Sequence, residues 1–440
     1  MFGYYIDLAL RSLMRTPVLT ALMVLAIGLG IGASMTMLTV LHVMTEDPLP
    51  GRSEHLYTPH LDPLPINFKT DPMGTNPNQS LTWPDTMALL RAHRNVQQAA
   101  MAGGNVLVWP QRTDLQPFYV DGRYTTHAFF EMFGVPFVEG GGWTAADDQV
   151  SAHVVVLAEA LAHKLFGTAD AVGKTIRLGA LDYRVIGVTK DWAPKPLFYA
   201  DASARFYSDA DQFFLPLSDV LNSKQRDGDL HISGNVSGWS DFNGNMRDPS
   251  TTWIQFWVKL DTPMQVATYR QFLVDYSAEQ KSLGRYQRPP TNAKLYSLMG
   301  WLRHENLVPD DVKLQMWLAL GFLGVAMLNI VALLLAKFLR RSGEVSVRRA
   351  MGARRRDIFV QFGIESALIG VAGGLLGLGI AQFGLWSIRH RPDDYAHLAK
   401  MDPSMLVGTV MLAIAASVFA GLLPAWRACR VPPALQLKAQ

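Results

Sequence analysis

The sequence predicts an integral membrane protein with four transmembrane helices and a large α+β (mixed α/β) domain inserted between helices 1 and 2. Four apolar runs are each long enough to cross about 30 Å of hydrocarbon at about 1.5 Å per residue. Basic residues gather beside alternate ends of these runs, and about 270 residues of mixed composition separate the first run from the second. We therefore expect four membrane crossings and one large soluble domain.

The four apolar runs contain almost no charge. No Asp, Glu, Lys or Arg interrupts the first run (18–41), the second (316–336) or the fourth (405–426), and Glu365 is the only charged residue of the third (358–388). The first run is longer than the 7–15 residues of a signal-peptide core and no small-x-small cleavage site follows it, so we expect an uncleaved anchor. We assign the transmembrane helices to residues 18–43, 313–337, 358–388 and 405–426.

Basic residues indicate the orientation of the spans, because short cytoplasmic loops hold an excess of Lys and Arg. Arg11 and Arg15 precede the first span, and residues 337–357 contain eight Lys or Arg against two acids. Further basic residues follow the fourth span. Three segments are thus expected in the cytoplasm: an elbow helix at 1–17, a loop at 338–357 and a tail at 427–440.

Residues 44–312 and a short loop at 389–404 are expected on the opposite side of the membrane. The long segment is mildly acidic, with 24 basic and 30 acidic residues between positions 44 and 315. The single cysteine, Cys429, falls on the cytoplasmic side, so this domain is expected to fold without disulfides. Nucleic-acid binding has no support, because the basic residues lie where topology alone requires them.

Alternating strand and helix patterns predict the inserted α+β domain. Residues 84–94 and 263–282 have helical patterns, whereas the Pro-rich segment 46–80 and the polar segment 222–250 are predicted to be loops. We expect two lobes, the inserted lobe covering roughly 125–225. The predicted strands lie at 102–109, 116–122, 153–157, 175–178, 182–188, 253–260 and 293–298.

The basic loop has the pattern of a short helix as well as the charge of a cytoplasmic segment. Glu344 and Arg348 have the favourable i,i+4 spacing, Ser342 can cap the helix, and Gly352 can end it. A helix lying at the cytoplasmic membrane face could be gripped by another protein.

Glycines in the first and third spans predict close helix packing. Small-xxx-small spacing lets two backbones approach closely in lipid. The interface could lie within one subunit or across a dimer. The pairs are Gly28 with Gly32, Gly370 with Gly374, and Gly373 with Gly377.

Glu365 is expected to have a structural role near the interface. An acid near a helix N-terminus is tolerated. A proton-relay role is the alternative, and we disfavour it because we find no partner charge in the other spans.

The chain lacks the motifs of familiar enzymes. FGTADAVGKT (166–175) resembles a phosphate loop, but five residues rather than four separate Gly167 from Gly173, so a turn leading into a strand is favoured. No HExxH or G-x-S-x-G motif is present. We therefore expect no catalytic, cofactor-binding or metal-binding residue and no enzymatic activity in this chain.

Three stretches resemble the MacB/FtsX-type permeases of ABC transporters. EVSVRRAMGARRRDIFVQFGIESALIGVAGGLLGLGIA (344–381) is similar to the coupling helix and glycine-rich span of that family, and PAWRACRVPPALQLK (424–438) to its C-terminal pattern. VVVLAEALAHKLFGTADAVGKTIRLGALDYRVIGV (154–188) resembles the MacB-like periplasmic core domain.

The resemblance implies a bacterial inner-membrane protein whose large domain is periplasmic. Two permeases, identical or different, would join two cytoplasmic ABC ATPase subunits, and membrane lipids would surround them. A periplasmic adaptor and an outer-membrane channel are further candidate partners. The coupling helix that docks on the ATPase would comprise Ser342, Glu344, Val345, Val347, Arg348, Arg349, Met351 and Gly352.

The resemblance favours mechanotransmission, in which ATP hydrolysis by a separate chain moves the periplasmic domain to export or extract a substrate. The alternative is an FtsX-like regulator that transmits the ATPase state to periplasmic cell-wall hydrolases. A membrane-bound enzyme is a third hypothesis, and no catalytic constellation supports it.

Overall fold

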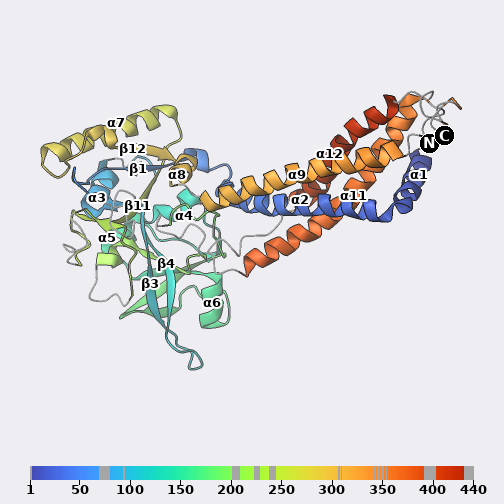
Figure 1. Ribbon diagram of the computed structural model, residues 1–440. Coiled ribbons are helices and arrows are strands. Elements are labelled where there is room, and N and C mark those ends of the chain that lie inside the picture. Colours follow the sequence, from blue (N-terminus) through green and yellow to red (C-terminus); the bar gives the residue numbers. More distant parts are fainter. Residues whose placement is uncertain are drawn as a thin grey trace. The chain divides into compact units, whose positions relative to one another are not determined.

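The chain forms two compact units, which we call the helical unit (1–45 and 308–440) and the inserted domain (46–307). Figure 1 shows both in the computed structural model. The structure describes residues 2–68, 80–92, 95–200, 209–221, 228–236, 244–305, 308, 310–340, 343, 347, 351–352, 354–390 and 403–430.

Four helices of the helical unit are long and apolar enough to cross a membrane. Together with the mixed α/β domain between the first and second of them, they confirm the predicted fold class. A shorter helix, α1 (Phe2–Arg15), precedes them, and Pro17 begins the next helix at a position where its missing N–H is no loss. The four are α2 (Pro17–Thr45), α9 (Asp310–Arg340), α11 (Arg355–Arg389) and α12 (Pro403–Arg430).

Helix α11 packs against α1, α2 and α12, while α9 packs against α2 and α12. Their shared core contains Met23, Ile27, Ile330 and Phe362. Large apolar side chains remain on the outer surfaces of the helices, such as Phe322 on α9, which is 49% exposed. Apolar outer faces suit a bundle whose surroundings are lipid.

The inserted domain is built on a twelve-stranded sheet within the described residues. The strands follow one another in space as β12-β1-β11-β3-β4-β9-β6-β8-β5, with β2 and β10 paired to β11, and β7 paired to β3 and β8. Most pairs are antiparallel, and β4–β9 and β6–β8 are parallel. The strands are β1 (Leu56–His60), β2 (Leu81–Thr82), β3 (Gln98–Trp109), β4 (Phe118–Thr125), β5 (Phe137–Gly140), β6 (Val154–Ala158), β7 (Thr175–Leu178), β8 (Leu181–Thr189), β9 (Phe213–Pro216), β10 (Gly234–Asn235), β11 (Thr251–Lys259) and β12 (Lys294–Ser297).

Short helices lie around this sheet, and one long helix, α7, lies near β12 and β1 in Figure 1. Strands β5 to β9 form one end of the sheet, and the ladder of β1 with β12 forms the other. The predicted division into two lobes stays a prediction. The helices are α3 (Trp83–Ala92), α4 (Ala128–Phe133), α5 (Ala145–Val150), α6 (Glu159–Phe166), α7 (Pro263–Ser282) and α8 (Leu298–His304), with single turns η1 (Ser53–His55), η3 (Leu217–Leu221) and η5 (Pro290–Asn292).

Both segments predicted to be loops contain a strand, because the two-residue β10 lies within 222–250 and β1 lies within 46–80. Within 46–80, β1 pairs with β11 on one side and β12 on the other. Pro59 lies opposite Leu295 in this ladder, and a proline within a short run argues against a strand when only the sequence is read. Pairing with strands far along the chain overrides that local signal.

The segment that resembles a phosphate loop is a turn into a strand, as predicted. Gly167 ends α6 in the left-handed conformation, Gly173 has φ +85°, and β7 begins at Thr175. The Lys174 ammonium donates a hydrogen bond to the Asp170 carbonyl 2.6 Å away. This lysine therefore stabilises its own turn.

Candidate functional site

The segment that joins α9 to α11 carries the residues that sequence reasoning singled out. Ser342, Glu344, Val345, Arg348 and Arg349 lie outside the described residues, so their roles stay predictions. The described part holds one backbone hydrogen bond, in which the Met351 N–H donates to the Val347 carbonyl at 3.0 Å.

Two apolar side chains of this segment are exposed. Val347 is 54% exposed and Met351 is 76% exposed. Gly352 follows with φ +100°, a conformation that suits glycine and turns the backbone out of a helix. Exposed Val and Met beside a sharp turn give the segment a small apolar surface.

Four of the predicted packing glycines lie between α2 and α11. A side chain added at Gly28 would lie 2.8 Å from Leu376, and one added at Gly32 would lie 2.7 Å from Ile380. From the opposite helix, Gly373 faces Ile27 and Gly377 faces the backbone of Gly28. The backbones of α2 and α11 therefore approach within one chain.

The remaining pair, Gly370 and Gly374, faces α12. A side chain at Gly370 would lie 2.9 Å from the Ile414 Cα, and one at Gly374 would lie 2.9 Å from the Ala413 Cβ. The two glycine pairs of α11 thus alternate between partners, with α2 on one face and α12 on the other. Both interfaces are intramolecular.

A buried ion pair joins α9 to α11. The Lys337 ammonium lies 2.5 Å from the Glu365 Oε1 atom, and the two side chains are 1% and 0% exposed. The Ser12 hydroxyl of α1 donates a hydrogen bond of 2.6 Å to the same oxygen. Three helices therefore meet at one carboxylate.

The sequence-based statement that Glu365 has no partner charge in the other spans was wrong. The prediction ended the apolar run of the second span at the last residue before Lys337, but α9 continues as a helix to Arg340. Lys337 is therefore inside the bundle, not in the loop. The signal that could have revealed the pair is a lysine at the end of an otherwise apolar run, eight residues after Asn329. An acid lies at a similar depth in the next span.

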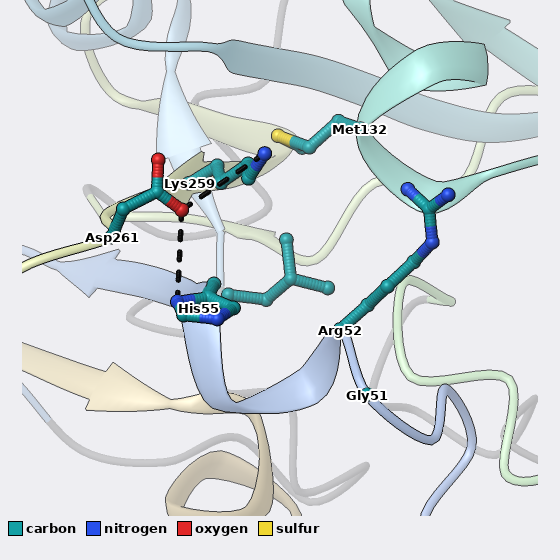
Figure 2. A pocket seen from close by; sticks show the side chains of 7 residues that line it. Gly51, Arg52, His55, Met132, Lys259 and Asp261 are labelled. Carbon is teal, nitrogen blue, oxygen red and sulfur yellow. Dashed lines mark ion pairs between the residues drawn. The ribbon is translucent and has the colours of Figure 1, made fainter.

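A small cavity of the inserted domain is lined by charged groups (Figure 2). Its volume is about 380 Å³. The Asp261 carboxylate lies 3.6 Å from the His55 Nδ1 atom and 3.9 Å from the Lys259 ammonium, and all three side chains are more than a third exposed. Arg52 donates a hydrogen bond to the Glu131 carbonyl near the end of α4. Such exposed pairs contribute little to stability, and here they shape the cavity wall.

A larger cavity of about 820 Å³ lies between α3, α4, α5 and η3. Trp83, Leu90 and Leu217 give it an apolar wall, which suits a small organic molecule. At its rim, Asp148 accepts hydrogen bonds from the Trp143 indole at 2.7 Å and from the His127 backbone at 2.9 Å. The Oδ2 atom of Asp148 therefore joins the start of α4 to α5, while its Oδ1 atom binds Trp143 just before α5.

One buried acid of the inserted domain has no cation beside it among its described contacts. Asp219 on η3 is 5% exposed. Burial raises the pKa of the Asp219 carboxyl to about 7, and the hydrogen bond from Tyr183 lowers it only in part. The carboxyl therefore titrates near neutral pH.

No group of three or more metal-ligating side chains occurs among the residues that the structure describes. Several described acids of the inserted domain are paired with structural partners, as in the Asp85 carboxylate, which accepts from Tyr276 and Arg285 at 2.7 and 2.9 Å. These contacts join α3 to the end of α7. They hold this part of the domain together.

Two family matches cover most of the chain. Residues 20–274 match the MacB-like periplasmic core domain, and residues 316–433 match the FtsX-like permease C-terminal region. The first match alone exceeds half of the chain.

Among the relatives, the macrolide export ATP-binding/permease protein MacB of Rhodospirillum rubrum is 25% identical over 441 residues, which is 100% of this chain and 61% of that protein. The pyoverdine export ATP-binding/permease protein PvdT of Pseudomonas aeruginosa is 24% identical over 429 residues, 96% of this chain and 56% of the relative. This chain thus spans less than two thirds of the length of these relatives.

Among solved structures, the periplasmic region of MacB from Actinobacillus actinomycetemcomitans is 17% identical, with a TM-score of 0.36, and the match covers 58% of this chain and 94% of that one. The extracellular domain of the transporter YknZ from Gram-positive bacteria is 13% identical, with a TM-score of 0.32, and covers 50% and 95%.

Proposed function

Because the chain belongs to the MacB/FtsX-type family of ABC transporter permeases, we propose that it couples ATP hydrolysis by a cytoplasmic ATPase to movements of its inserted domain. The ATPase would be a separate chain present in two copies, with two permeases in the functional unit. The inserted domain would lie in the periplasm, and both termini in the cytoplasm.

The observation that carries this proposal is the position of the 341–354 segment inside the FtsX-like region, between two membrane-length helices. Its described part offers the exposed side chains of Val347 and Met351. Apolar side chains in a segment whose sequence is rich in arginine are the composition expected of a docking surface for another protein. We infer that the ATPase grips this segment.

The packing of the helical unit supports transmission from that segment. A shift of the segment would move the ends of α9 and α11, and α11 packs tightly on α2 through its glycines. Helices α2 and α9 are the two that lead directly into the inserted domain along the chain. Close backbone contacts transmit displacement well, because packed interiors are hardly compressible.

The names of the relatives favour export over regulation, since both a macrolide and a pyoverdine export protein are similar over nearly the whole chain. We propose that the movement exports or extracts a substrate from the periplasmic side. An outer-membrane channel or adaptor that purifies with the complex would support export. A cell-wall hydrolase in its place would favour the regulatory alternative.

The double variant Glu344→Ala/Arg348→Ala tests the docking surface. We expect it to insert and fold normally but to lose the stimulation of ATP hydrolysis by the permease, by about tenfold or more, since a coupling free energy of 1–3 kcal/mol corresponds to 5- to 150-fold. The measurement is ATP hydrolysis by the purified complex in lipid nanodiscs.

Asp7→Ala/Arg11→Ala is the matched control. These residues form an exposed i,i+4 acid–base pair of the same order, with 2.8 Å between the charged groups. Stimulation should survive this change. Full stimulation in the Glu344/Arg348 variant would contradict the proposed docking.

A further inference from the structure

A compact cluster ties three helices together beside the 341–354 segment. It consists of Ser12 on α1, Lys337 and Phe338 on α9, and Phe362 and Glu365 on α11, and we call it the base cluster. The Phe338 and Phe362 rings stack with centroids 4.0 Å apart and planes at 20°. The ion pair and the stacked rings therefore join α9 to α11 near the ends that flank the segment.

The base cluster is closed to water. Lys337 is 2% exposed, Glu365 is 0% exposed and Ser12 is 3% exposed. Helix α12 covers the same level, because a side chain added at Gly421 would lie within contact distance of Ser366 and 3.6 Å from the Leu334 Cδ1 atom. Parting α9 from α11 would separate the ammonium from its carboxylate in a dry, weakly polarisable interior, which is strongly unfavourable.

Rotation of the two helices is far less restricted than their separation. A lysine ammonium is a compact point charge with three equivalent donors on a flexible stem. The ammonium contacts the Glu365 Oε1 atom, and a point charge of this kind can keep its contact while either helix turns. An arginine in this place would fix the carboxylate with a planar fork.

We propose that the Lys337–Glu365 pair is an electrostatic pivot, which prevents the ends of α9 and α11 from parting and still allows them to rotate about each other. The pivot would make both helices follow a displacement of the segment between them. The source of that displacement rests on the proposed function, whereas the pivot itself is a property of this chain.

Spin labels at Ala336→Cys and Val360→Cys, both exposed positions on α9 and α11, test the pivot. The background carries Cys429→Ser, which removes the only native cysteine. In the full chain in nanodiscs, we expect a narrow distribution of label distances for the native pair. Glu365→Gln and Lys337→Met should broaden the distribution, and the exchanged pair Lys337→Glu/Glu365→Lys should narrow it again.

The variant Lys337→Arg tests whether the pair only holds α9 against α11 or also allows the two helices to rotate. We expect this variant to keep the narrow distribution, because the charges still attract, but to lose the stimulation of ATP hydrolysis by about tenfold, because the fork restricts rotation. A purely structural pair would tolerate arginine in both measurements.

Thr409→Ala is the matched control. Thr409 is 0% exposed, and its hydroxyl donates to the Met405 carbonyl of its own helix at 2.7 Å. Loss of this hydroxyl removes a buried polar contact within one helix and breaks no link between two helices. The label distances and the stimulation of ATP hydrolysis should therefore stay native.

Native distance distributions in Glu365→Gln and Lys337→Met would overturn the pivot. So would native stimulation in Lys337→Arg. If neither single variant folds, the exchanged pair decides: a folded protein with native distances supports the pivot, and an unfolded one overturns it. If the native permease does not stimulate ATP hydrolysis in the complex, the proposed function is wrong. The label distances still test the Lys337–Glu365 pair in that case.

Discussion

Each unit of the molecule buries an ion pair, and the two pairs are built differently. In the inserted domain, the Arg123 Nε and Nη2 atoms contact the two oxygens of Asp211 at 3.1 and 3.2 Å. The guanidinium also lies over the Tyr199 ring, 4.9 Å from its centroid, and donates to the Tyr199 carbonyl. In the helical unit, Lys337 reaches one oxygen of Glu365.

The two cations differ in how strictly they fix the position of their carboxylate. A planar fork with an aromatic partner has one favourable geometry, so Arg123 fixes β4 against the chain that enters β9. A point charge permits many orientations of its partner. The Arg123–Asp211 pair thus holds its partners in one geometry, whereas the Lys337–Glu365 pair by itself holds two helices together without fixing the angle between them.

The largest effect is expected from breaking the rigid pair. Asp211→Asn removes the charge and leaves the Arg123 guanidinium buried without its carboxylate, so we expect a loss of about 3–5 kcal/mol in the free energy of unfolding. Thermal or denaturant unfolding of the full chain in detergent measures it. Asp209→Asn, at an exposed position two residues earlier, should change stability by less than about 0.5 kcal/mol. Equal effects of the two variants would mean that Arg123 does not depend on Asp211.

A second prediction concerns the buried acid that lacks a cation. Because the pKa of Asp219 is raised to about 7 in the folded domain and is 3.8 when unperturbed, the folded state binds the extra proton between these values. The contribution of Asp219 to stability should therefore be highest below about pH 4, fall as the pH rises to about 7, and stay level above it. The loss amounts to up to about 4 kcal/mol at about 1.4 kcal/mol per pKa unit.

Asp219→Asn isolates this dependence on pH. The variant should lose the fall in stability between pH 4 and 7, and it should be relatively more stable than the native chain at pH 8. Unfolding of both full-length proteins across this range gives the comparison. Parallel pH profiles would contradict the assignment to Asp219.

The smallest effect should come from the glycine interface of the helical unit. At Gly32, an added methyl group would lie 2.7 Å from Ile380 and 3.0 Å from the Gly377 carbonyl, and overpacking of this kind costs about 1–3 kcal/mol. Gly321 on α9 has open space around it. Gly32→Ala should therefore lower the unfolding temperature in detergent, and Gly321→Ala should not. A loss in both would indicate a general sensitivity of these helices to alanine.

Elements with local signals were predicted well from the sequence. Helix α7 begins and ends where the pattern placed it, because Thr262 and Gln265 form a capping box and Pro263 occupies the first turn. Strand β7 also has the predicted bounds. In these places the determining contacts lie within a few residues of each other.

Features that depend on distant partners were missed. Strand β1 exists because β11 and β12 lie beside it. Lys337 belongs to the bundle because Glu365 offers it a carboxylate, and a rule that ends a span at its first charge cannot detect that. Sequence spacing identified the glycines that face α2 and α12, but not which helix each of them meets.

The ladder of β1 with β12 has a consequence for how the inserted domain could change over evolution. The chain enters the sheet through β1 and leaves it through β12, and these neighbours pair from Tyr57 with Ser297 to His60 with Lys294. Entry and exit therefore share one two-stranded stem. Segments between His60 and Lys294 can be enlarged or trimmed while β11, which pairs with β1, and the stem keep their spacing. The outer part of the domain could then change in size on the same membrane helices.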